Sequence, residues 1–301
     1  MTDSVKLKLT ISNILILAYI LMQVAMLIVF KGLNNLFLPI VYLVAAGIIL
    51  LLSMFPATQK PSIYHFIKHF TPLALVLVFY RVIGVQLSLA GFRVRDSLFY
   101  NLEYSVMGMY PSFVLQRLME VWLNELSYGF YLSGILIILW AIFKFYRRGY
   151  MDIFENYLTA LVMGGVLCLL LTSVFPVYGP GKALAEYYYL GFYGPFLSII
   201  MPFFMTLFTP TVGSFPSLYF CLLTIASYYL WDYGKSYIII SFVVLTAVFW
   251  GGIYLRYHYL LDALAALLIA FLAATVANFI FYFKHGKNIE DSGKTVSDSA
   301  E

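Results

Sequence analysis

Long apolar runs with few charged residues are the feature that most constrains the fold of this chain. A helix that crosses a bilayer needs roughly 20 consecutive apolar residues. Of the 301 residues, 63% are hydrophobic and 11% are charged, whereas a soluble domain has about 25% charged residues. We therefore predict an integral membrane protein. Soluble α/β enzymes, secreted disulfide scaffolds and nucleic-acid-binding proteins are excluded.

The predicted fold is all-α, a polytopic membrane bundle of about eight transmembrane helices. Eight spans put both termini on one side of the membrane, and the two long connections at 91–126 and 176–213 on the other. Of the 18 Lys and Arg residues, 11 fall on the side of the termini and 6 on the side of the long connections. The positive-inside rule then makes both termini cytoplasmic. The expected spans lie at about 11–30, 36–55, 71–90, 127–146, 156–175, 214–231, 236–254 and 258–283.

The sequence divides into N-terminal membrane helices, a membrane domain and a C-terminal tail. Residues 1–90 form the N-terminal membrane helices, and residues 91–287 form the membrane domain that carries the candidate site. Residues 288–301 are polar, with mixed charge, and are predicted to be a disordered cytoplasmic tail. Cys168 and Cys221 each lie inside an apolar run without disulfide or metal spacing, so we interpret both as packing residues.

Three ionisable residues stand at the beginning of the last apolar run. Such groups are costly near a membrane unless they pair, face water or serve a site. His258 and Asp262 are four residues apart, so a helix places them on one face and the carboxylate accepts a hydrogen bond from one imidazole nitrogen. The other nitrogen is then left unprotonated, as a nucleophile or base requires. The spacing alone also fits an interfacial histidine paired with an acid for structural reasons.

Two further segments are expected on the same face as His258. Ser214 and Ser217 precede the sixth run, and a helix N-terminus with serine hydroxyls is a suitable seat for a phosphate, although Ser and Pro are also ordinary helix-start residues. Lys182 follows a Gly-Pro-Gly turn at the end of the fifth run. It offers a point charge to a phosphate, or else is a snorkelling lysine at the membrane interface.

Together, the stretches Phe175–Lys182, Ser214–Tyr219 and Tyr254–Asp262 carry a family resemblance. The chain resembles the type 2 phosphatidic acid phosphatase superfamily, in the branch of inositol phosphorylceramide synthases and their bacterial relatives. The resemblance covers roughly residues 95–280 and is most specific in Tyr-Leu-Arg-Tyr-His-Tyr followed by Asp262. It implies that His258 attacks phosphorus to form a phosphohistidine, that Asp262 orients the imidazole, and that water or an alcohol resolves the intermediate.

The chain departs from the family pattern at two positions. The family places a second histidine directly after Pro-Ser-Leu to protonate the leaving alcohol, and here that position is Tyr219. A phenol with a pKa of about 10 is a poor general acid near neutrality, although Tyr219 still offers a hydrogen bond to phosphoryl oxygens. The family's arginine six residues before the catalytic histidine is Gly252 here. Arg256 is a phosphate-binding candidate in its place, or contacts a neighbouring lipid headgroup.

The leading hypothesis is a lipid phosphatase or phosphotransferase acting on a lipid phosphate or phospholipid headgroup. We expect the site on the outer face of a bacterial plasma membrane, or in a Golgi-type lumen in a eukaryote. The alternative is a degenerate member that binds lipid phosphates or acts as a scaffold without turnover. We expect no cofactor and no metal, since the outer face lacks a carboxylate cluster with ligand spacing. His65 and His69 are interpreted as juxtamembrane residues rather than metal ligands.

Overall fold

The computed structural model describes residues 9–29, 37–54 and 62–297 as a bundle of α-helices. Six of these helices are long and apolar enough to cross a membrane. The prediction of a helical integral membrane protein is therefore confirmed. The six are α1 Ile11–Val29, α3 Ile63–Leu89, α6 Val121–Arg147, α7 Met151–Val174, α11 Lys235–Tyr254 and α12 Leu260–Ser297, of which the apolar span is Leu260–Phe283.

Two of the expected spans are shorter helices in the structure. Helix α2, Phe37–Ser53, has 17 residues, and helix α10, Leu218–Trp231, has 14. All eight apolar runs thus contain a helix, but two of those helices fall short of the length expected for a full crossing. The count of eight spans and the side on which the termini lie stay predictions.

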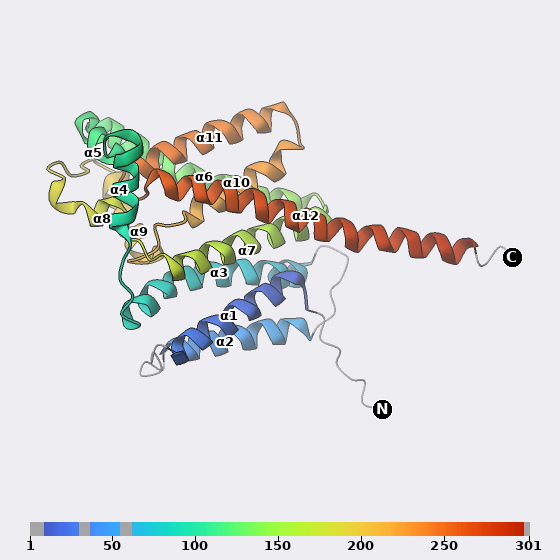
Figure 1. Ribbon diagram of the computed structural model, residues 1–301. Helices are drawn as coiled ribbons and strands as arrows, with labels where there is room; N and C mark the ends of the chain where they lie inside the picture. The colour runs from blue at the N-terminus through green and yellow to red at the C-terminus, as the bar shows by residue number, and fades with distance from the viewer. Residues whose placement is uncertain (1–8, 30–36, 55–61, 298–301) are drawn as a thin grey trace.

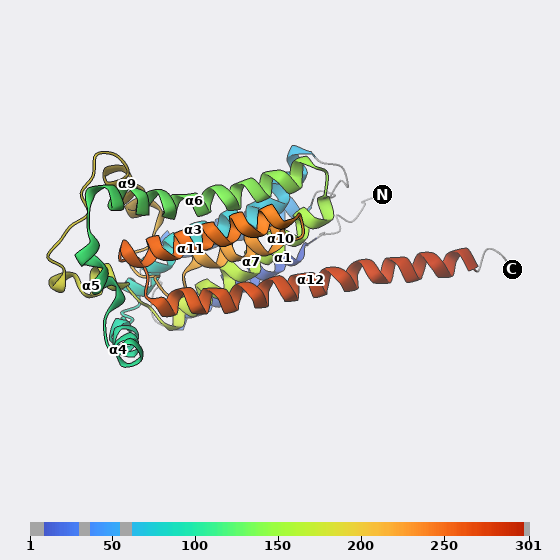
Figure 2. The ribbon, with the colours of Figure 1, turned by 90° about the horizontal axis from the view of Figure 1, so that it is seen from above.

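The two long connections fold into short helices that gather at one end of the bundle (Figure 1). The turned view shows α4 and α5 beyond the ends of the long helices (Figure 2). Helix α9 was not expected from the sequence, because its apolar run is short and contains Pro202. The short helices are α4 Asp96–Met107, α5 Pro111–Leu115, α8 Pro180–Ala183 and α9 Leu197–Phe208, with 3₁₀ turns at Gln116–Leu118 and Ala185–Tyr187.

Helix α7 is the central element and packs against α1, α3, α10 and α12. A Cβ at Gly165 would collide with Val76 of α3, and a Cβ at Gly164 would lie 2.7 Å from Ile225 Cδ1 of α10. Small residues at these crossings let the helices approach closely. Close van der Waals packing is what holds helices together in a membrane, because the hydrophobic effect does not drive their association there. Cys168 and Cys221 are buried and free, in agreement with their interpretation as packing residues.

Two helix boundaries differ from the expected spans. Helix α3 begins at Ile63 rather than near residue 71, because Ser62 caps it by accepting a hydrogen bond from His65 N at 3.2 Å. His65 and His69 therefore belong to the helix itself. Helix α12 continues to Ser297, beyond the expected end of the last span near residue 283. Disorder of residues 288–301 stays a prediction, and residues 298–301 lie outside the described part of the chain.

Candidate functional site

A tight turn after α11 brings His258 to the end of the bundle. Arg256 adopts a left-handed conformation with φ +63°. The amide of Tyr257 donates to Gly252 O at 2.9 Å and that of Arg256 to Ile253 O at 3.1 Å, the paired bonds of a Schellman motif. A non-glycine residue in this conformation stores strain of the order of 1 kcal/mol or more, which is typical of functional sites. The turn reverses the chain so that α12 starts beside α10.

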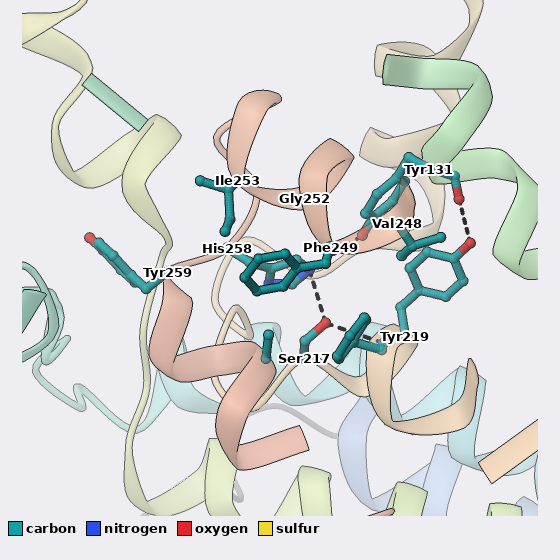
Figure 3. A pocket seen from close by; sticks show the side chains of 11 residues that line it. Tyr131, Ser217, Tyr219, Val248, Phe249, Gly252, Ile253, His258 and Tyr259 are labelled. Carbon is teal, nitrogen blue, oxygen red and sulfur yellow. Dashed lines mark hydrogen bonds between the residues drawn. The ribbon is translucent and has the colours of Figure 1, made fainter. Parts of the chain in front are cut away.

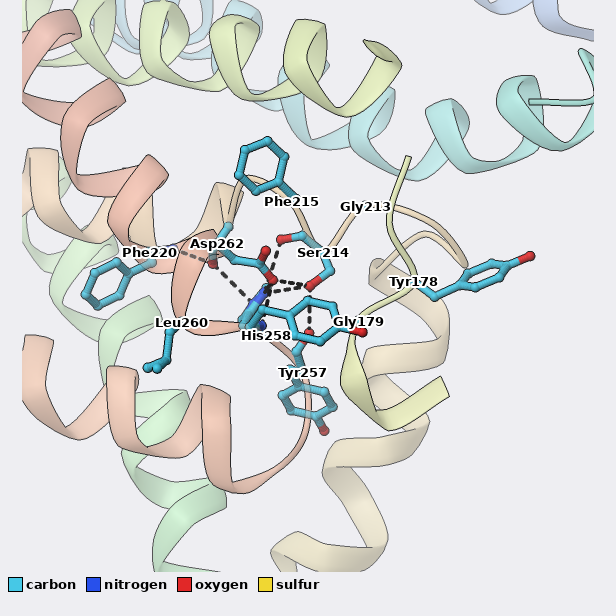
Figure 4. Close-up of polar contacts among 12 residues, drawn as sticks. Tyr178, Gly179, Gly213, Ser214, Phe215, Phe220, Tyr257, His258, Leu260 and Asp262 are labelled. Carbon is cyan, nitrogen blue, oxygen red and sulfur yellow. Dashed lines mark hydrogen bonds and ion pairs between the residues drawn. The ribbon is translucent and has the colours of Figure 1, made fainter. Parts of the chain in front are cut away.

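The histidine and the aspartate form one buried polar cluster with Ser214 (Figure 4). His258 Nδ1 lies 3.4 Å from Asp262 Oδ2 and 3.2 Å from Ser214 O. The Ser214 hydroxyl donates to Asp262 Oδ2, and the amide of Tyr259 donates to the same oxygen at 2.8 Å. These contacts surround Nδ1 with acceptors, so Nδ1 carries the ring proton and Nε2 presents the lone pair. His258 and Asp262 are paired as their spacing predicts, but His258 lies two residues before the start of α12 rather than on the helix itself.

The second ring nitrogen meets two hydroxyl groups (Figure 3). His258 Nε2 lies 3.1 Å from Ser217 Oγ and 3.3 Å from Tyr131 Oη. The expected proximity of Ser217 and His258 is thereby confirmed. Ser217 also caps α10 by accepting from Phe220 N at 3.3 Å. A phosphorus atom that reaches Nε2 has to displace at least one of these hydroxyl contacts, because the small cavity of about 10 Å³ beside the ring holds no more than a water-sized group.

The loop that follows α7 is held against the dyad by an aspartate of α4. Asp96 accepts from the amides of Tyr178 at 2.9 Å and Gly179 at 3.0 Å, and from the Tyr259 hydroxyl at 3.2 Å. Burial raises the pKa of the Asp96 carboxyl, and the two amide hydrogen bonds oppose that rise. Gly179 has φ +93°, and a Cβ there would lie 2.7 Å from Tyr257 O, so only glycine fits between the loop and the histidine turn.

His258 lies on the wall of a cavity of about 790 Å³ that also contains three basic side chains, those of Arg81, Lys182 and Arg256. Arg81 comes from α3 and is exposed. Lys182 Nζ lies 3.8 Å above the Tyr178 ring. Arg256 is 8% exposed and donates through Nη2 to Leu190 O at 2.8 Å. The lining of the cavity that His258 borders therefore carries positive charge, as a site for an anionic group requires.

The two serines predicted to bind phosphate, Ser214 and Ser217, lie on opposite sides of the His258 ring. Ser214 lies on the Nδ1 side of His258 and lines the large cavity, where its hydroxyl is engaged with Asp262. Ser217 lies on the Nε2 side and is 1% exposed. The geometry therefore gives Ser214 the character of a positioning residue for the dyad. Ser217 is the serine next to the nitrogen with the lone pair.

Tyr219 lines the same cavity, but its hydroxyl faces helix α6. It donates a hydrogen bond to the backbone carbonyl of Tyr131. Gly134 makes room for the phenol, because a Cβ at that position would collide with the Tyr219 hydroxyl. In this structure the phenolic proton is thus committed to a backbone oxygen and is not presented to His258.

Four residues around the site were not among the predicted site residues: Tyr131, Arg81, Asp96 and Glu103. Glu103 accepts a hydrogen bond from the Leu260 amide at the start of α12, and burial raises the pKa of its carboxyl to about 7. Arg81 is the Lys or Arg residue that falls within an expected span, 71–90, and on neither side of the membrane. That position is itself a signal, since a charged residue within a membrane helix indicates function by default. Tyr131 had no such signal among 26 tyrosines.

Comparisons with protein-family models, with curated proteins and with solved structures find no match to this chain.

Proposed function

We propose that this protein is a membrane-embedded phosphotransferase or phosphatase that acts on a lipid phosphate or phospholipid headgroup through a phosphohistidine at His258. One observation carries the proposal. The imidazole has its Nδ1 held by Asp262 and Ser214 O, and it borders a cavity of about 790 Å³ lined by three cations. The resemblance to type 2 phosphatidic acid phosphatases assigns the same two residues to the same roles.

The proposed chemistry has two steps. Nε2 of His258 forms a bond to phosphorus while the bond from phosphorus to the leaving oxygen breaks. The ring becomes cationic, and the carboxylate of Asp262 stabilises that charge through the Nδ1 proton. Water or an acceptor alcohol then attacks phosphorus, releases the imidazole, and loses its proton to solvent or to the first leaving group. The cations Arg81, Lys182 and Arg256 neutralise the phosphoryl oxygens.

The leaving oxygen needs a proton only when the leaving group is poor. Tyr219 occupies the position of the family's acid, and its hydroxyl is bonded to the Tyr131 carbonyl. We therefore expect low activity on simple lipid phosphates whose leaving group is an alkoxide. Substrates whose leaving group departs as a stabilised anion, such as a phosphate or a phosphoester, need no general acid and suit this site better.

The imidazole beside a cavity lined by cations also favours a second candidate function, that of a catalytically degenerate protein that binds lipid phosphates. An imidazole and three cations suffice for binding, whereas turnover of most esters needs a proton donor. The two candidates differ in whether a phosphoryl group is ever transferred to His258.

Purified full-length protein incubated with ³²P-labelled lipid phosphates and lipid diphosphates separates them. We expect phosphate release from at least one lipid and an acid-labile, alkali-stable label on the protein. His258→Ala is expected to lose both, while a Ser133→Ala control, altered at a hydroxyl bonded within its own helix at Phe130 O, keeps both. Binding of all lipids without label or release in wild type would overturn the enzymatic proposal and favour the binding protein.

We further propose that α2 and α10 complete an eight-span topology with cytoplasmic termini and the site on the outer or luminal face. The excess of Lys and Arg on the side of the termini supports this orientation. Cysteines introduced as Gly191→Cys and Ser292→Cys are expected to react from opposite sides of the membrane, the first with an impermeant reagent on intact cells. Equal labelling of both would contradict the topology.

A further inference from the structure

A second cluster of ligand-type side chains lies at the end of the bundle opposite the candidate site. It consists of His65 and His69 on α3 and Glu155 on α7. Helix α4 follows the end of α3, and α8 follows the end of α7, so the beginnings of α3 and α7 lie far from the dyad (Figure 1). Among the residues that the structure describes, no other group of three His, Cys, Asp or Glu side chains converges in this way.

The three side chains meet at one carboxylate oxygen. His65 Nε2 and His69 Nε2 each lie 3.4 Å from Glu155 Oε1. All three ligand atoms lie within 4.8 Å of one another, and the two imidazole rings have centroids 4.4 Å apart. The convergence arises because residues four apart on α3 share one face, and α7 packs against that face.

These distances are compatible with metal coordination, as they are with an ion pair. In a tetrahedral zinc site the ligand bonds are about 2.0 to 2.2 Å long, which places neighbouring ligand atoms roughly 3.4 Å apart. Both imidazole-to-carboxylate distances equal that edge length.

The two imidazoles are buried, and the carboxylate is partly exposed. His65 is 1% exposed and His69 is 6% exposed, whereas Glu155 is 28% exposed. Solvent therefore reaches the cluster from the side of the carboxylate. Two histidines and one carboxylate with an open fourth position form a recurring protein site for Zn²⁺.

In place of the interpretation of His65 and His69 as juxtamembrane residues without a ligand role, we propose that His65, His69 and Glu155 bind a divalent transition-metal ion, with Zn²⁺ as the ion of best fit. The ion links α3 to α7 at the end of the bundle away from His258. Mg²⁺ and Ca²⁺ fit this cluster less well, because they prefer sets of oxygen ligands. The inference does not depend on the proposed lipid chemistry, since none of its three residues lines the catalytic cavity.

The test uses full-length protein in detergent, without a polyhistidine tag, stripped with a chelator and titrated with Zn²⁺ against a chromophoric competitor. We expect one Zn²⁺ per chain and a rise in the Tm of wild type on Zn²⁺ addition. His69→Gln and Glu155→Gln are each expected to weaken binding by at least the roughly 10- to 100-fold seen when supporting residues of metal sites are removed. The control His258→Ala, which alters a histidine outside the cluster, should bind Zn²⁺ as wild type does.

Cobalt spectroscopy keeps the test decisive if a variant fails to fold. Co²⁺ added to wild type should give the intense visible bands of four- or five-coordinate geometry, and Zn²⁺ should displace them. Equal Zn²⁺ binding by wild type and Glu155→Gln would overturn the proposal. Wild-type protein that binds neither ion at micromolar concentration, or shows only weak octahedral Co²⁺ bands, would overturn it as well.

Discussion

Replacing Asp262 with asparagine tests the electrostatic role of the dyad most directly. Asp262 is fully buried, and its Oδ2 lies 3.4 Å from His258 Nδ1. Asparagine keeps the size of the side chain and an oxygen that can accept from the Tyr259 amide. It removes the negative charge that faces the imidazole and replaces the other carboxylate oxygen with an NH2 group.

The expected loss follows from that separation. Unit charges about 3.4 Å apart attract by roughly 5 kcal/mol at an effective dielectric constant of about 20. The positive charge of a phosphorylated imidazole is spread over the ring, and the amide dipole retains part of the attraction. We therefore expect the barrier for phosphorylation to rise by about 3 to 5 kcal/mol, which slows the step roughly 100- to 5,000-fold.

Single-turnover labelling with a ³²P-lipid substrate measures this step separately from binding and release. Asp262→Asn should form the phosphohistidine slowly but still detectably, whereas His258→Ala should form none. Size-exclusion profile and Tm serve as folding controls, because Asp262 also accepts from Ser214. A folded Asp262→Asn protein that is labelled within about 3-fold of the wild-type rate would refute the charge argument.

Three further changes probe the groups around the dyad. Tyr219→His installs an imidazole at the position of the family's acid and should raise hydrolysis of a simple lipid phosphate by up to ~10²- to 10⁴-fold; an unchanged rate in a folded variant would argue against a poised site. Arg81→Gln should raise the KM for an anionic lipid roughly 10- to 150-fold, because it removes a charged hydrogen bond of about 1.5 to 3 kcal/mol. Arg81→Lys is the milder control, and an unaltered KM in Arg81→Gln would remove Arg81 from the site. Glu103→Gln should change the pH dependence of the Tm: folding raises the pKa of this carboxyl from 4.5 to about 7, so its contribution to stability is complete below pH 4.5 and is lost as pH rises through about 7. The Tm of wild type should therefore fall relative to Glu103→Gln between these values, and parallel curves would contradict the assignment.

The parts of this protein that could be predicted from sequence are those set by short-range patterns. The length of an apolar run decides whether a helix suits a membrane, so the helical membrane bundle followed directly from the sequence. The spacing of four residues between His258 and Asp262 predicted their pairing, because both lie within one turn of the same helix start. Ser214 and Ser217 were expected near His258 only from the resemblance and from the predicted side of the membrane.

The remaining features depend on packing between helices that are distant in the chain. Tyr131 reaches His258 Nε2 across a separation of 127 residues, because α6 and α11 pack together. Glu155 meets His65 and His69 only where α7 crosses α3, so no spacing in the sequence indicates that cluster. In a membrane, helix contacts are decided by close packing of small residues and by a few polar bonds, and neither appears as a periodic signal along one chain segment. The hydrophobic pattern therefore determined that helices form, whereas the side chains that share a cavity were decided by how those helices pack.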